Sequence, residues 1–340
     1  MTKRVAVVGA TGYSGAELVL LLAQHPRATL AAVFSGPAGE AAPFASIHPA
    51  LAGRTGPAVR PFALAALLDA GPEVVFLATP NELSAGLVPE LQARDIAVVD
   101  LSGAYRLRDS SLYAAWYGFE HPAPHLLEQA VYGLTEWCDG ELAGAKLVAN
   151  PGCYPTAILL ALKPLAARLD PVQPIVCDAK SGVSGAGKRG ELDYSFVELA
   201  GNFKAYSVGT HRHEPEIRTR LGLPEAATLV FVPHLLPVPR GILATLYVAF
   251  GAPQTDAGLE QCFAAAYRDA AFVDVLPAGQ LPELRQVVGT PRALLGFRRL
   301  DGGRRAVVVA VIDNLLKGAA SQAVQNFNRM CGFAATEGLR

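Results

Sequence analysis

Cys153 is the residue best suited to covalent chemistry. It lies in Asn150-Pro-Gly-Cys-Tyr-Pro-Thr156, between the apolar run Leu147 to Ala149 and a stretch that is predicted to be helical. A cysteine near a helix N-terminus has a lowered pKa because the helix dipole stabilises the thiolate, and a thiolate is the nucleophile for covalent catalysis on an acyl group. Position alone leaves a buried, inert cysteine as the alternative. The other cysteines are interpreted as structural: Cys138, Cys177, Cys262 and Cys331.

Two histidines, His211 and His213, stand in the segment Gly209 to Ile217. The Pro215-Glu216 pair predicts a helix start, so both histidines are expected in an extended lead-in, where alternate residues share a face. An imidazole titrates near neutral pH and can act as a general acid and base beside a thiol. No third metal ligand is evident nearby, so we expect no metal site. A surface pair of histidines without function is the alternative.

Hydroxyl and cationic side chains occur in apolar surroundings at three further places. The Gly-rich segment Asp178 to Lys188 carries Ser181 and Ser184 and is suited to binding a phosphate, although a solvated connection has the same composition. Arg106 and Arg240 could each bind a carboxylate or a phosphate through two parallel hydrogen bonds. A structural ion pair is the alternative for either arginine.

A GxxGxxG turn follows the first apolar run of the chain and precedes a helical pattern. Glycines allow a tight turn and close approach of a pyrophosphate, which the N–H groups at the helix N-terminus then bind. This strand–turn–helix context predicts a dinucleotide site, with a tight turn that binds nothing as the alternative. The cofactor-binding candidates in the turn are Gly9, Thr11, Gly12, Tyr13, Ser14 and Gly15.

The second strand ends in Phe34-Ser-Gly-Pro37. No acidic residue is present there to bind a ribose 2′-hydroxyl, and no arginine is present to bind a 2′-phosphate, so these residues leave NAD and NADP both open. Ser35 and the backbone N–H of Gly36 are candidates for holding a phosphate, and Arg54 or Arg60 could reach in from the following loop.

The elements that must position these residues fall into two groups. In the first 100 residues short apolar strands alternate with helices, which predicts βαβ units and a parallel sheet. The strands are expected at 4–8, 28–34, 74–78 and 96–100, and the helices at 15–24 and 83–93. Beyond residue 150 a helix at 154–169 precedes β-rich stretches at 174–179, 228–233, 242–250 and 304–312, and a last helix is expected at 317–330. The predicted fold class is therefore α/β, a Rossmann-type parallel sheet followed by an α+β domain.

Composition excludes several classes of function. The chain has 340 residues, 51% hydrophobic and 17% charged, which suits two domains with large cores rather than disorder. The formal net charge of −1 gives no indication of nucleic acid or anionic membrane as a partner. We see no signal peptide, no transmembrane run and no CxxC pair, so we expect a cytoplasmic protein with free thiols.

Seven segments together resemble one family, the N-acetyl-gamma-glutamyl-phosphate reductases of the aspartate-semialdehyde-dehydrogenase-like group. They are VGATGYSGAELVLLL, DLSGAYRL, NPGCYPTA, DAKSGVSGAGK, GTHRHEPEI, PHLLPVPRGILAT and IDNLLKGAASQAVQNFN. The resemblance implies an enzyme of arginine biosynthesis that reduces N-acetyl-gamma-glutamyl phosphate to N-acetylglutamate 5-semialdehyde with NADPH and releases phosphate. A phosphorylating dehydrogenase for another acyl phosphate and a dinucleotide-sensing regulator are the competing interpretations.

The resemblance also implies roles for the residues. Cys153 would be the nucleophile that forms a thioester, and His213, or failing that His211, the acid/base. Asn314 joins the glycine turn and Ser35 as a cofactor-binding candidate, and the substrate-binding candidates are Arg106, Ser181, Ser184 and Arg240. The implied domains are an NADP-binding domain of residues 1–151 with the C-terminal helix 315–340, and a catalytic and oligomerisation domain of residues 152–314. A homo-oligomer, dimer or tetramer, is expected.

Three positions depart from the family pattern. Gly36 stands where relatives usually have arginine, Glu40 where they have lysine, and Asn81 where they have histidine. The absent arginine and the absent acidic residue together predict NADP(H) use with weaker discrimination against NAD(H).

Overall fold

The computed structural model describes residues 1–138, 140–188 and 192–339. The chain forms two compact units, each with its own seven-stranded sheet. The first unit comprises Met1–Gly152 and Ala319–Arg340, and the second comprises Cys153–Gly318. The second unit is therefore inserted into the chain of the first.

The sheet of the first unit is parallel throughout, in the order β3-β2-β1-β4-β5-β7-β6. Its central strands are runs of β-branched and other apolar residues that are buried on both faces, as a doubly covered parallel sheet requires. The strands are β1 Lys3–Val8, β2 Ala28–Phe34, β3 Val59–Arg60, β4 Val74–Leu77, β5 Ala97–Asp100, β6 Val131–Tyr132 and β7 Leu147–Ala149.

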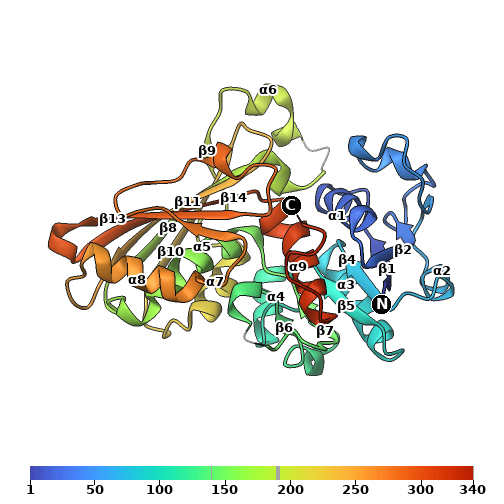
Figure 1. Ribbon diagram of the computed structural model, residues 1–340, viewed down its shortest axis with the longest axis horizontal. Helices are drawn as coiled ribbons and strands as arrows, with labels where there is room; N and C mark the ends of the chain where they lie inside the picture. The colour runs from blue at the N-terminus through green and yellow to red at the C-terminus, as the bar shows by residue number, and fades with distance from the viewer. Residues whose placement is uncertain (139, 189–191, 340) are drawn as a thin grey trace. The chain divides into compact units, whose positions relative to one another are not determined.

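Helices cover both faces of this sheet (Figure 1). Helix α9 packs on α1 and reaches the sheet through Phe327, whose ring lies 5.6 Å from that of Phe76. A second core joins Val8, Phe34 and Leu77 to Leu87 and Leu91 of α3. The helices are α1 Tyr13–Gln24, α2 Leu64–Asp69, α3 Asn81–Gln92, α4 Ser111–Tyr117 and α9 Ser321–Met330, with 3-10 turns at Phe44–Ser46, Pro49–Leu51, Pro124–Leu126 and Thr135–Trp137.

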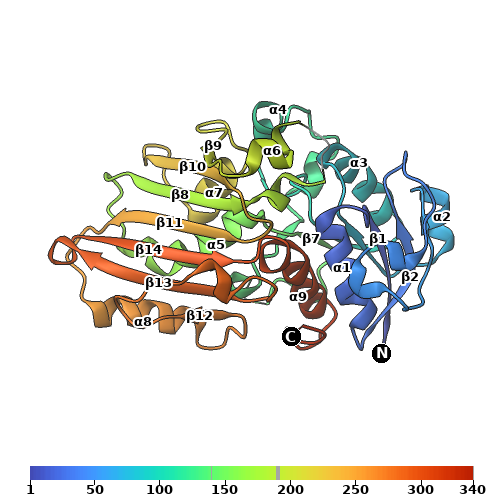
Figure 2. The same cartoon turned by 90° about the horizontal axis from the view of Figure 1, so that it is seen from above.

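The sheet of the second unit is mixed, in the order β12-β13-β14-β11-β8-β10-β9 (Figure 2). Strand β8 is parallel to β10, whereas β11 is antiparallel to both β8 and β14. The strands are β8 Ile175–Gly182, β9 Lys204–Ala205, β10 Leu229–Leu236, β11 Ile242–Ala249, β12 Val273–Val275, β13 Ala293–Leu300 and β14 Arg305–Ile312.

One face of this second sheet is covered by helices and the other is half-exposed. Helix α5 packs on β11 and β14, and α7 packs on α5 and β10. Burial alternates along β8 accordingly, since Cys177 and Ala179 are buried while Asp178 and Lys180 are half-exposed. The helices are α5 Cys153–Leu162, α6 Phe196–Leu199, α7 His213–Leu221 and α8 Asp256–Tyr267, with 3-10 turns at Lys163–Arg168, Val183–Ala186, Leu192–Tyr194, Leu284–Gln286 and Asp301–Gly303 and a π-helical turn at Leu316–Ala320.

The predicted fold class is confirmed, although several short elements were not predicted and others differ in their bounds. The helix expected at 154–169 ends as an α-helix at Leu162, because Pro164 lacks the N–H that the next turn needs. The last α-helix begins at Ser321 rather than 317, after the π-helical turn. Strand β13 was not predicted, since Gly296 and the charged Arg298 and Arg299 interrupt its apolar pattern.

Candidate active site

The glycine turn of the first unit has a geometry that other residues cannot adopt without strain. Gly9 has φ +87°, and a Cβ atom there would lie 2.2 Å from the carbonyl oxygen of Ala78. A Cβ atom on Gly15 would lie 2.2 Å from the carbonyl oxygen of Gly9. The turn therefore lets the start of α1 pack against the end of β1 with no side chain between them.

Helix α1 begins at this turn with unblocked backbone donors. Its N-cap is Gly12, which has no side chain to accept a hydrogen bond from the first turn, and that turn holds no acidic residue. Thr11 and Tyr13 are exposed, and Ser14 is half-buried beside them. N–H groups and a positive dipole end at a cradle without side chains fit the pyrophosphate of a dinucleotide.

Ser35, a further cofactor candidate, is buried at the end of β2. Its hydroxyl donates to the carbonyl oxygens of Gly36 at 3.2 Å and Arg60 at 3.3 Å. A Cβ atom on Gly39 would lie 2.2 Å from this hydroxyl oxygen, so the loop covers it closely. The hydroxyl is thus committed to the protein's own backbone.

In the second unit Cys153 is the first residue of α5 and is half-buried, whereas the rest of that helix is buried. Gly318 lies beside it, since a Cβ atom on Gly318 would be 2.9 Å from the Cβ of Cys153. The missing side chain at Gly318 leaves the space that Cys153 occupies. Gly318 stands in the segment IDNLLKGAASQAVQNFN, but nothing in that segment indicates that it lies beside Cys153.

His211 and His213 gather around the aromatic ring of Tyr154, the residue after Cys153. The ring of Tyr154 lies 5.7 Å from that of His211 and 6.0 Å from that of His213, and the two imidazoles are 4.7 Å apart. The motif around Cys153 indicated no role for Tyr154. In the structure its ring contacts both histidines, so they lie next to the residue that follows the thiol.

The expected extended conformation is wrong for His213, whereas His211 lies before the helix. Helix α7 begins at His213 itself, and Arg212 already has right-handed helical angles. The reason is a local hydrogen bond: the His213 N–H donates to Nδ1 of His211 at 3.1 Å, so the side chain of His211 closes the turn that starts the helix. The rings still meet, through a turn rather than along a strand.

The protonation of His211 follows from its surroundings. Burial, together with the nearby charge of Arg212, lowers the pKa of His211 to about 4. The imidazole is therefore neutral at neutral pH, with Nδ1 as the acceptor for the backbone. Burial likewise raises the pKa of the Tyr206 hydroxyl, which donates to Tyr154 at 3.2 Å, to about 12. Both tyrosines are thus neutral.

The loop candidates of the second unit form one hydrogen-bonded group. Asn314 accepts from the Gly241 N–H at 2.7 Å and donates to the Ser184 hydroxyl at 3.0 Å. Ser181 is buried, and its hydroxyl donates to the carbonyl oxygen of Gly182 at 2.9 Å. Of this group only Ser184 carries a hydroxyl that is half-exposed.

Arg240 forms a structural ion pair with Asp313, which was the alternative to a role in binding substrate. Its Nε lies 3.1 Å from one carboxylate oxygen of Asp313 and its Nη2 lies 3.1 Å from the other. Asp313 is fully buried and also accepts from the N–H groups of Leu315 and Gly289. The pair therefore fixes the loop after β14.

Arg106 lies in the first unit and is buried. Its Nε donates to the carbonyl oxygen of Asn150 at 2.8 Å and its Nη2 to that of Leu101 at 2.8 Å. The guanidinium thus holds the segment that leads into Cys153. Nearby, burial raises the pKa of Asp100 despite hydrogen bonds from Ser102.

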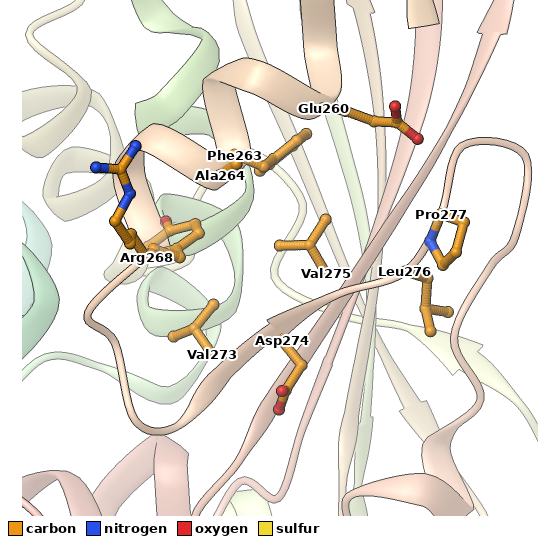
Figure 3. A pocket seen from close by; sticks show the side chains of 10 residues that line it. Glu260, Phe263, Ala264, Arg268, Val273, Asp274, Val275, Leu276 and Pro277 are labelled. Atoms are coloured by element: carbon orange, nitrogen blue, oxygen red, sulfur yellow. The ribbon is translucent and has the colours of Figure 1, made fainter. Parts of the chain in front are cut away.

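A cavity of about 520 Å³ lies elsewhere in the second unit, between α8 and β12 (Figure 3). Apolar side chains such as Phe263 and Val275 line it, with Arg268 at its edge. None of the site residues above contributes to it, so it is separate from the thiol chemistry.

The described residues contain neither a metal-binding cluster nor a helix that could span a membrane. No cluster of three or more histidine, cysteine or carboxylate side chains there could hold a metal ion. Within the same residues, each helix is too short or too polar to span a bilayer. The five cysteines, all of which are described, form no disulfide bond.

Comparison with known proteins decides the family. Residues 4–145 match the family described as "Semialdehyde dehydrogenase, NAD binding domain", and residues 153–314 match "Semialdehyde dehydrogenase, dimerisation domain". N-acetyl-gamma-glutamyl-phosphate reductases from Bordetella bronchiseptica and Neisseria meningitidis are 42% and 45% identical to the chain, and each alignment covers 99% of it and 96% of the relative. The chain belongs to the N-acetyl-gamma-glutamyl-phosphate reductase family. The resemblance based on the seven segments is thereby confirmed.

Membership makes this chain an oxidoreductase of amino-acid biosynthesis with a nicotinamide-dinucleotide-binding domain. Solved structures share the fold at lower identity. An aspartate semialdehyde dehydrogenase II from Vibrio cholerae aligns with a TM-score of 0.69 at 19% identity, over 97% of this chain and 98% of that one. Fold and family are thus fixed, while the residue roles rest on the geometry above.

Proposed function

We propose that this N-acetyl-gamma-glutamyl-phosphate reductase converts N-acetyl-gamma-glutamyl phosphate to N-acetylglutamate 5-semialdehyde with NADPH, through a thioester on Cys153. The single observation that carries the proposal is the first turn of α5. There a half-buried thiol stands at a helix N-terminus, and the adjoining Tyr154 ring contacts the rings of His211 and His213.

The first step is acyl transfer. The Cys153 thiolate attacks the carbonyl carbon of the acyl phosphate, a C–S bond forms, and the C–O bond to phosphate breaks with its electron pair leaving on phosphate. The N-terminus of α5 stabilises the thiolate before attack. A thioester is more easily reduced than an oxygen ester.

The second step is reduction. The glycine turn would hold the pyrophosphate of NADPH, which when bound would supply the hydride. His213 donates a proton to the thioester oxygen as negative charge develops there and takes it back as the C–S bond of the thiohemiacetal breaks. The thiolate of Cys153 is regenerated and the aldehyde leaves. The proton consumed overall departs on phosphate.

The remaining assignments divide between cofactor and substrate. For the cofactor we propose the glycine turn, the backbone beside Ser35, and Asn314. For the substrate we propose Ser181, Ser184, Arg106 and Arg240. A residue that binds substrate without taking part in proton transfer should raise KM more than it lowers kcat when it is substituted.

We also propose a cytoplasmic homo-oligomer, dimer or tetramer, assembled through the half-exposed face of the second sheet. Val176 pairs with Val230 on one side and Tyr247 on the other, so three apolar side chains form one row across β10, β8 and β11. Val230 and Tyr247 are 37% and 45% exposed. Exposed apolar rows of this kind mark association surfaces. Sedimentation velocity over a range of concentrations tests this.

The decisive test is the phosphate-dependent reverse reaction with N-acetylglutamate semialdehyde, run with NADP and NAD in parallel. Cys153→Ser should lose at least about 1000-fold in kcat, because a hydroxyl is hardly ionised at neutral pH, while cofactor affinity is kept. Cys262→Ser, at another half-buried free thiol of the second unit, is the matched control and should retain activity. Substantial turnover by Cys153→Ser would exclude the thioester. Faster turnover of the semialdehydes one methylene shorter or longer would exclude the substrate.

A further inference from the structure

Three strands end side by side at the carboxyl edge of the first sheet. The N–H groups of Gly9 and Ala10 both donate to the carbonyl oxygen of Phe34 at 2.9 Å. The N–H of Ser35 in turn donates to the carbonyl oxygen of Arg60 at 2.9 Å, and Phe34 is the register partner of Arg60. The glycine turn, the end of β2 and the end of β3 are therefore consecutive along one edge.

The end of the second strand is where a Rossmann-type fold distinguishes its two cofactors. An acidic side chain there binds the 2′-hydroxyl of NAD, whereas an arginine nearby binds the 2′-phosphate of NADP. This chain has neither on β2: the Ser35 hydroxyl is committed to backbone carbonyls, and Gly36 has no side chain. Apart from Gly36 and its two neighbours in the chain, no described residue has an atom within 4 Å of the position that a Cβ on Gly36 would occupy. The end of β2 thus leaves an open space beside Gly36 and has no charged side chain to bind a phosphate there.

Arg60 provides the charge from the neighbouring strand. It is exposed, and its guanidinium carbon lies 5.6 Å from the centroid of the Phe34 ring, directly beside the end of β2. Over residues 1–138, 140–188 and 192–339, no carboxylate pairs with this guanidinium and no oxygen accepts a hydrogen bond from it. A planar, permanently charged guanidinium can bind a phosphate through two parallel hydrogen bonds.

We propose that Arg60 of β3 binds the 2′-phosphate of NADP(H) and so takes the part that a β2 arginine plays in other NADP-dependent Rossmann folds. The assignment rests on the proposed use of NADP(H). Arg60 determines cofactor specificity and takes no part in the transfer of hydride. A charged group on β3 rather than β2 also explains how the glycine at position 36 is tolerated.

The test is calorimetric titration of the full chain with NADPH, NADH, 2′,5′-ADP and 5′-AMP. Arg60→Ala should weaken NADPH and 2′,5′-ADP by about 10- to 100-fold, the range of one charged hydrogen-bonded contact, and leave NADH and 5′-AMP within about twofold. Arg60→Lys should have an NADPH affinity between those of the unaltered chain and Arg60→Ala, because lysine keeps the positive charge but cannot make two parallel hydrogen bonds. Arg94→Ala is the control: Arg94 follows α3 at the opposite edge of the sheet and pairs with Glu90 of its own helix.

A rescue variant makes the result independent of folding defects. Gly36→Arg in the Arg60→Ala chain should restore NADPH affinity, since the space beside Gly36 is open. Equal weakening of NADPH and NADH by Arg60→Ala would overturn the proposal and assign Arg60 to adenine stacking. Unchanged NADPH affinity in Arg60→Ala would overturn it in favour of another cation. If the unaltered chain binds NADH more tightly than NADPH, the cofactor assignment itself fails instead.

Discussion

The two histidines of the site differ in what their imidazoles can do. His211 uses Nδ1 to accept the His213 N–H, and its pKa is lowered to about 4, so its imidazole is neutral at neutral pH and lacks the acidic proton of an imidazolium. His213 is buried at the first position of α7, with its ring against Tyr154. We therefore propose His213 as the residue that transfers the proton, with His211 in a positioning role.

His213→Ala should lower kcat by about 100- to 10,000-fold, the range for general acid/base residues, and change KM by less than about threefold. Steady-state rates in both directions measure this. A variant that loses affinity for substrate while keeping kcat would assign His213 to binding instead.

At the scale of elements, a hydrogen bond from the backbone to a histidine side chain starts a turn at four places in the chain. His25, His48, His121 and His211 each accept, through Nδ1, the backbone N–H two residues ahead. Asparagine makes the same local bond with its side-chain oxygen. In α7 this bond sets the residue at which the helix begins.

His211→Asn should therefore keep kcat within about threefold, whereas His211→Ala should lose about tenfold and about 1 kcal/mol of stability through the lost turn bond. The pH profile of kcat should keep its shape in both variants, because His213 is intact. Loss of one limb of that profile in His211→Asn would show that His211 itself exchanges the proton.

Elements also show how far the sequence could predict the structure. The apolar runs of the first 100 residues suffice to predict β1, β2, β4 and β5, but not β3, which has two residues and ends in Arg60. The start of α7 was misplaced because Pro215 was taken as the helix start, and a side-chain bond from His211 leaves no periodic pattern. The nearness of Gly318 to Cys153 joins residues at opposite ends of the second unit, which no local signal encodes.

Across the whole molecule, neutral buried histidines make stability depend on pH. Burial lowers the pKa of His25 and His121 in the first unit and of His211 in the second. The unfolded chain then binds protons at a higher pH than the folded chain, so stability is complete above about pH 6.5 and falls as the pH drops toward the folded values. Acid should destabilise both units.

For His211 the change between pH 7.5 and pH 5 should be about 2 kcal/mol, from a folded pKa of about 4 against an unfolded value of about 6.5. Urea unfolding gives the free energy of unfolding of the unaltered chain and of His211→Asn at both pH values. The contribution of His211 is the loss between pH 7.5 and pH 5 in the unaltered chain minus the loss in His211→Asn. His125→Asn, at an exposed imidazole, controls for the substitution. Equal acid sensitivity of the unaltered chain and His211→Asn would contradict the prediction.

The closeness of Gly318 to Cys153 has a consequence for how such proteins can be rearranged. These residues are the two ends of the second unit, and the amide of Asn150 correspondingly donates to the carbonyl oxygen of Ala319 at 3.3 Å in the first unit. A unit whose ends meet can be inserted into, or removed from, a loop of another without stretching either chain. Cys153 is the first residue of the inserted unit. Exchanging residues 153–318 for another unit would therefore replace the thiol and leave the dinucleotide-binding domain in place.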